Sequence, residues 1–317
     1  MSLGALGYVG YGVEDTEGTS VAPTKFLPVS SFSMDDSNEF IVPDQIRHSR
    51  DRYIALPGPY PVDGTMEMEL IPTETAELLR SAWAASVNSS PYGGGGYEHA
   101  YTPGSEEPTL TFESSAGDIL VLRYAGMRVN TLEIKAAFGE IVTASFGLMG
   151  LDREKQESTS SPDFTDVTPF HFTGADIHVA SGQVLGIVKD FTFGTNNNFT
   201  RIGTLRRTRR WKRIAFGMRE VTLAMNFDFT DDSEYDRFLA EDVFDIDLYM
   251  EGNAALTGMG TQVPVLRIQP VNVRWNKAPV PLSANEYLSQ SVEALVIAPI
   301  GGDIFTASLV NADSAVA

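Results

Sequence analysis

The stretch from Leu185 to Phe229 decides the fold, because the chain carries a second version of it from Phe26 to Pro72. The segment at 191–199 reads FTFGTNNNF and the segment at 32–40 reads FSMDDSNEF, so the two versions align without a gap at a numbering shift of 191 − 32 = 159. A period of about half the chain is too long for a solenoid repeat, which runs roughly 20–50 residues. We therefore expect two copies of one domain in tandem.

A second matched segment predicts the secondary structure of each copy. TLAMNF at 222–227 falls on TMEMEL at 65–70, at a numbering shift of 222 − 65 = 157. Apolar and polar residues alternate in both, and this period of two is typical of a half-buried β-strand. A helix is expected after each strand, with Arg237 of the second helix falling on Arg80 of the first. The inward faces of these helices are expected to carry Ala76, Leu79, Ala82 and Trp83 in the first copy and Tyr235, Phe238 and Leu239 in the second.

Further apolar segments after each helix are interpreted as strands, because glycines punctuate them at turn positions. Each copy is therefore expected to be mostly antiparallel β with one helix, and the fold class to be mainly β. We predict an extended N-terminal arm at 1–28, a first domain at 29–152, a polar linker at 153–181, a second domain at 182–304 and a weakly structured C-terminal tail at 305–317.

The N-terminal arm carries apolar side chains that are costly to leave in water. Tyr8, Tyr11, Phe26 and Leu27 are the residues expected to dock, and we predict that they dock on a neighbouring subunit. The alternative is a frayed terminus, which is common where nothing ties a chain end down.

Composition and spacing argue against several kinds of chemistry. The 317 residues include no cysteine, which rules out a disulfide, a thiolate metal site and a cysteine nucleophile. The four histidines have no recognisable metal-binding spacing, and Gly93–Gly96 lacks the Gly-Lys-Ser/Thr that completes a phosphate loop. Adjacent acidic pairs such as Asp35-Asp36 do not supply facing catalytic carboxylates. We therefore expect no enzyme activity, no cofactor, no metal and, since no long apolar run occurs, no membrane span.

One charged cluster stands out from the acidic background. Seven of the 23 basic residues lie between Arg201 and Arg213, and the rest of the chain then has a charge of 16 − 42 = −26. Because the matching stretch of the first copy is also basic, the cluster suggests a repeated contact with the acidic surface of another identical subunit. The alternatives are a nucleic-acid patch and a solvated flexible loop. The predicted contact residues are Arg47, His48, Arg50 and Arg52 in the first loop and Arg201, Arg206, Arg207, Arg209, Arg210 and Arg213 in the second.

The glycine- and proline-rich N-terminal pattern resembles a known family. GYGVE at 10–14, Gly18-Thr19 and PTKFLP at 23–28 are similar to the N-terminal signature of bacteriophage tail tube proteins, also called major tail proteins. The resemblance implies two tandem β-sandwich domains, each with one flanking α-helix, in a subunit whose rings stack into a tube for the genome. It also implies that the loops at 40–53 and 199–213 reach the adjacent ring.

Since two domains share one chain here, the resemblance implies a trimeric ring with pseudo-sixfold symmetry, in a virion tail assembled in the host cytoplasm. The implied partners are other copies of the chain and the tape-measure, tail-terminator and baseplate or tip proteins. Double-stranded DNA would pass through without tight binding, which the net charge of −19 permits. Two other interpretations stay open, namely an all-β carbohydrate-binding or adhesion module of a virion and the tube of a contractile injection device.

Overall fold

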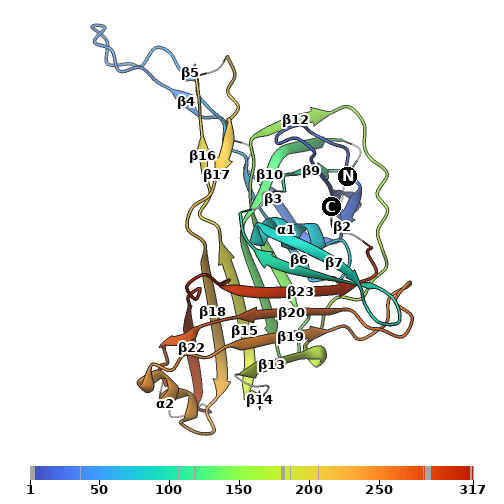
Figure 1. Cartoon of the computed structure of the whole chain (residues 1–317). Coiled ribbons are helices and arrows are strands. Elements are labelled where there is room, and N and C mark those ends of the chain that lie inside the picture. The colour runs from blue at the N-terminus through green and yellow to red at the C-terminus, as the bar shows by residue number, and fades with distance from the viewer. Residues whose placement is uncertain are drawn as a thin grey trace.

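The computed structural model describes residues 4–35, 37–105, 108–117, 119–179, 183–185, 187–205, 207–280, 282, 287–314 and 316 (Figure 1). These residues form many strands, two α-helices of eight residues each and two 3-10 turns, η1 (Gly4–Leu6) and η2 (Phe172–Gly174). The predicted fold class, mainly β of the sandwich kind with one helix in each half, is confirmed. Neither helix in the described ranges has the length and apolarity needed to cross a bilayer.

The first sheet has twelve strands and contains two sets of four that share the same neighbour order. The first-half set is β3 (Val29–Met34), β6 (Asp63–Glu69), β11 (Thr143–Met149) and β10 (Val121–Ala137). The second-half set is β15 (Val188–Asn196), β18 (Glu220–Asp228), β22 (Ser289–Val296) and β21 (Val273–Lys277). The alternating burial of β6 and β18 follows from their alternating sequences, which place every second side chain in the core.

The two sets join through one antiparallel strand pair. β10 of the first half pairs with β15 of the second, with Ile134 opposite Phe193 and Leu132 opposite Thr195. The halves therefore share one continuous sheet. Among the described residues, β3 pairs only with β6, whereas β21 pairs with β22 and with Phe244 through a single bridge at Val273.

The N-terminal arm extends this sheet. β1 (Tyr8–Val13) pairs with β2 (Lys25–Leu27) on one side and with β9 (Leu110–Ser115) on the other. β9 and β12 (Asp152–Gln156) both pair with the first part of β10. The second part of β10 pairs with β11 and β15. The arm is thus a structured part of the subunit.

The second sheet also mixes both halves of the chain, and its strands run across those of the first sheet (Figure 1). Its seven strands, in order, are β14 (Gln183–Val184), β13 (Ala175–Val179), β19 (Ile246–Glu251), β20 (Val265–Pro270), β23 (Phe305–Asn311), β8 (Tyr97–Pro103) and β7 (Ala85–Pro91). The segment expected to be a weakly structured tail instead forms β23, with Phe305 and Leu309 fully buried. The predicted linker likewise contributes β12 and β13.

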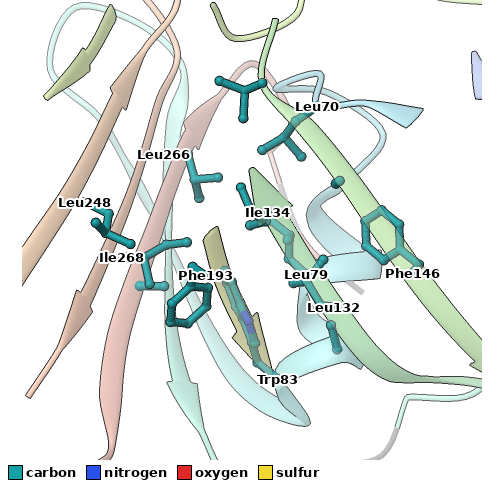
Figure 2. Packing of buried hydrophobic residues seen from close by; sticks show 14 of the residues in the cluster. Leu70, Leu79, Trp83, Leu132, Ile134, Phe146, Phe193, Leu248, Leu266 and Ile268 are labelled. Atoms are coloured by element: carbon teal, nitrogen blue, oxygen red, sulfur yellow. The ribbon is translucent and has the colours of Figure 1, made fainter. Parts of the chain in front are cut away.

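One hydrophobic core lies between the sheets and includes side chains from both halves. Figure 2 shows Leu79 and Trp83 of helix α1 (Ala76–Trp83) against β10, β15 and β20. The indole ring of Trp83 makes edge-to-face contacts with Tyr101 and Phe305, at centroid distances of 5.2 and 5.5 Å. Helix α2 (Ser233–Ala240) packs on β21, at the end of the first sheet.

Candidate assembly interface

The first basic loop projects from the body of the subunit. Short strands β4 (Phe40–Ile41) and β5 (Leu56–Pro57) form its base, and the loop extends away from both sheets (Figure 1). Arg47, His48, Arg50 and Arg52 are all exposed, as expected for contact residues. The Arg47 guanidinium lies 3.7 Å from the centre of the Tyr53 ring, and Arg52 lies 3.8 Å from Asp44.

Apolar side chains accompany these charges, and sequence reasoning missed them. The exposed large hydrophobic residues of the loop are Phe40, Ile41, Ile46, Tyr53, Ile54 and Leu56. A monomeric soluble protein seldom exposes so many apolar side chains together, and such patches mark interaction sites. These apolar residues are visible in the sequence, but they follow no strand or helix period that would mark them as a surface.

The second basic loop is held against its own chain. It connects β16 (Thr200–Ile202) and β17 (Arg213–Ala215). Arg201 forms a two-pronged ion pair with Asp63 at 2.6 and 3.0 Å and donates to the carbonyls of Val62 and Gly150. Because Arg201 is largely buried in these contacts, it stabilises the junction of the two halves and is not exposed for another subunit.

Two further arginines of this loop also bind the first half of the chain. Arg209 donates to the Gly58 carbonyl at 2.5 Å, and its guanidinium lies 5.3 Å from the Tyr60 ring centre. Arg210 forms an ion pair with Asp152 at 2.7 Å. Arg207, Arg210 and Arg213 are exposed, and the contact of this loop with another subunit stays a prediction. Arg206 lies outside the described residues.

The arm residues dock within their own chain. Tyr8, Tyr11, Phe26 and Leu27 are buried, and Tyr8 donates to Glu113 at 2.6 Å. Burial alone would raise the pKa of Glu113, but hydrogen bonds from Ser160, Tyr8 and Arg123 outweigh burial and hold that pKa below its usual value. These contacts differ from the expected docking on a neighbouring subunit, because the strand partner of the arm, β9, comes from the same chain.

The free strand edges of the first sheet are a further candidate surface that sequence analysis did not identify. β3 begins one four-stranded set, and β21, whose outer edge is bridged to Phe244 only at Val273 among the described residues, ends the other. Unpaired backbone N–H and C=O groups at an edge are a template for pairing with another chain. No periodicity distinguishes an edge strand from a central one, since the distinction depends on long-range pairing.

Histidine and carboxylate side chains form no metal centre in the part of the chain that the structure describes. No group of three or more His, Asp or Glu side chains in those ranges is arranged to hold a metal ion. His99 is buried, and its ring nitrogens hydrogen-bond Ser89 and Asn311 at 2.8 and 2.9 Å, which gives this histidine a structural role.

Comparison with known proteins gives one result. No curated protein matches the chain. A family model described as phage tail tube protein matches residues 4–295, which is nearly the whole chain. This match confirms the resemblance noted in the N-terminal pattern, and it agrees with a mainly β subunit that carries free strand edges. The chain therefore belongs to the phage tail tube protein family.

Proposed function

We propose that this chain is a structural subunit whose rings contain three copies and stack into the conduit of a phage tail. The observation that carries this proposal is the β10–β15 pair, which joins two four-stranded sets of identical neighbour order within one chain. Repeating the same junction between chains pairs β21 of one subunit with β3 of the next. Three chains then supply six sets, and the ring has pseudo-sixfold symmetry.

Ring closure follows from the geometry of head-to-tail contacts. Such contacts generate a ring when the rotation between neighbours closes, and a filament when it does not. A closed ring also removes both free edges, which are otherwise a liability for aggregation. The two halves differ in sequence and in their loops, so the symmetry of the ring is threefold.

Ring stacking is assigned to the projecting loop at 42–55. Its exposed arginines and apolar side chains suit contact with the acidic surface of the adjacent ring, since the chain outside the second basic cluster has a charge of −26. In this proposal the subunit is not an enzyme, and DNA passes the acidic lumen without tight binding. Assembly takes place in the host cytoplasm, with tape-measure, tail-terminator and baseplate or tip proteins as further partners.

Electron cryo-microscopy of the assembled protein tests the ring. We expect six similar lobes per ring that alternate in detail, with one chain supplying two adjacent lobes. Rings of six chains, with twelve lobes, would contradict the trimer. A protein that stays monomeric at high concentration, and does not enter tails in an infected cell, would contradict the tube function itself.

Charge reversal in the projecting loop separates stacking from ring formation. Arg47→Glu with Arg50→Glu is expected to give folded subunits and rings but at least tenfold fewer tubes, since both residues are exposed and contribute little to folding. Lys155→Glu with Lys189→Glu is the matched control, because it changes the net charge equally on strands β12 and β15. Tube yield is counted by negative-stain microscopy. Normal tubes from the loop variant would refute this assignment.

A further inference from the structure

Helices α1 and α2 correspond residue by residue. Their first residues differ in number by 233 − 76 = 157, and each helix contains a glutamate and an arginine three positions apart that form an ion pair. The distances are 3.6 Å for Glu77–Arg80 and 3.5 Å for Glu234–Arg237. Each helix ends at a residue in the left-handed conformation, Ala84 or Glu241, and each packs on the matching strand, β10 or β21. The two helices therefore occupy equivalent places in the two halves.

The two helices differ in how they are covered. All residues of α1 except Arg80 are buried, whereas only Glu234 of α2 is buried. Leu78 and Ala82 of α1 are fully covered, but the residues at the same positions of α2, Tyr235 and Leu239, are 37% and 62% exposed. The uncovered face continues to Val243, which is also exposed. This surface is the α2 face, defined by Tyr235, Leu239 and Val243.

Side chains from the second half bind the backbone carbonyls at the end of α1. Asn197 donates through Nδ2 to the carbonyl of Ala82 at 2.7 Å, and Arg219 donates to the carbonyl of Trp83 at 2.7 Å. The carbonyls of a last helical turn have no partner within the helix, so side chains that bind them stabilise the helix end. Both donors belong to the second half of the chain, and Asn197 directly follows β15.

A matching donor segment follows β3. In the alignment of the two halves, Asn38 falls on Asn197 and Phe40 falls on Phe199, at the shift of 197 − 38 = 159. Phe199 is 7% exposed, in a cluster with Leu151 and Ile214, whereas Phe40 is 62% exposed. The first half therefore has an exposed segment, 38–40, that contains a possible hydrogen-bond donor. The second half has an exposed helix α2 whose last carbonyls can accept.

The side-chain amide of Asn38 has its oxygen bound to an arginine, as the amide of Asn197 does. In the second half, Asn197 Oδ1 accepts a hydrogen bond from Arg219 at 3.2 Å while its Nδ2 faces α1. Asn38 Oδ1 likewise accepts from an arginine, Arg209, at 3.3 Å. With the amide oxygen held by arginine, the two N–H donors of the same amide point the other way and are available to an acceptor. The second basic loop thus orients the first half's donor.

We propose that Asn38 of one subunit binds the end of helix α2 of the next subunit, with its Nδ2 donating to the carbonyl of Leu239. The partner is a second copy of this chain, because the chain's own internal contact at α1 provides the template. This inference rests on the proposed ring and assigns residues to its junction. It also gives Arg209 a positioning role, since that arginine holds the Asn38 amide oxygen.

Cysteine crosslinking tests the contact, and the chain suits it because it contains no cysteine of its own. Asn38→Cys and Leu239→Cys are made as separate variants, mixed in equal amounts, assembled and treated with a short bismaleimide. We expect dimers on a denaturing gel from the mixture, and none from either variant alone or from the monomeric fraction. The variant carrying both substitutions is expected to give dimers and trimers.

An assembly measurement on a second variant tests the same contact without a crosslinker. Leu239→Glu is expected to raise the concentration needed for half-maximal assembly at least tenfold, whereas Ile119→Glu, which places the same charge at another exposed apolar residue, is expected to leave it unchanged. Thermal melts of the monomers check that both variants fold. Normal assembly of Leu239→Glu together with no crosslink in the mixture would overturn the contact while leaving the ring intact. Failure of the unmodified protein to assemble would instead contradict the proposed function.

Discussion

Replacing Met34 by proline is expected to leave the subunit folded but unable to assemble. Asp35 donates its backbone N–H to the Asp63 carbonyl at 2.7 Å, toward the neighbouring strand β6. Because successive N–H groups of a strand point to opposite edges, the N–H of Met34 points to the free edge of β3. By strand register its counterpart in the second half is Thr195, which lies opposite Leu132 in the β10–β15 pair. Proline removes this donor from each junction between subunits.

The expected loss is large because it recurs at every junction. An acceptor left without its donor costs about 1–3 kcal/mol, and each 1.4 kcal/mol is a factor of about ten in an equilibrium constant. Over the three junctions of a ring, the equilibrium constant for trimer formation should fall at least a hundredfold, which raises the concentration needed for assembly at least about tenfold. Analytical ultracentrifugation measures this rise, and circular dichroism checks the fold.

Met34→Ala is the matched control for the proline variant. It also removes the Met34 side chain but keeps the N–H, so it is expected to assemble at close to the normal concentration. Assembly of Met34→Pro at the same concentration as Met34→Ala would exclude β3 as a pairing edge. A ring built from other contacts would then be required.

Trp83→Ala is expected to lower the free energy of unfolding by about 3–5 kcal/mol, the usual cost of removing a large aromatic side chain from a core. Trp83 is 0% exposed and lies between Tyr101 of the first half and Phe305 of the second. Its removal leaves a cavity that strands of two sheets cannot easily fill. Urea denaturation followed by circular dichroism measures the change, with Tyr92→Ala as the control at a partly exposed aromatic residue.

The number of transitions in the same denaturation curve shows whether the two halves unfold together or separately. Because Trp83 contacts both halves and both sheets mix strands from each half, the subunit should unfold in one cooperative transition that Trp83→Ala shifts as a whole. Two transitions, with only the earlier one moved by the substitution, would show that the halves fold as separate units.

Local patterns predicted those parts of the fold that depend on neighbours in sequence. The alternation around Met66 and Met68 placed β6 correctly, because burial of one sheet face leaves a period of two. The apolar stripe ending at Trp83 predicted α1 for the same kind of reason. The N-terminal pattern indicated the family.

Long-range pairing accounts for what the sequence did not reveal. Arg201 and Asp63 are 138 residues apart, and nothing in the basic cluster shows that some of its charges are neutralised within the chain. Likewise β23 alternates apolar and polar residues, but nothing local shows that it lies between β20 and β8. The arm residues were expected to dock, but their partner strand β9 lies far along the chain from the arm, beyond the reach of any local pattern.

The position of β23 also has a consequence for how the subunit folds. Its pairing with β8 brings together His99 and Asn311, which are 212 residues apart in the chain and 2.9 Å apart in space. Sheets with contacts of such long range form slowly, in milliseconds to seconds, because the entropy of loop closure is lost before the contacts form. The β10–β11 hairpin can form much earlier, because its strands are close in sequence. Until β23 is made and pairs, β8 and β20 lack their shared partner. We therefore expect the rate at which competent subunits appear to depend on the closing of this long loop, and mispairing between unfinished chains to increase when synthesis is fast.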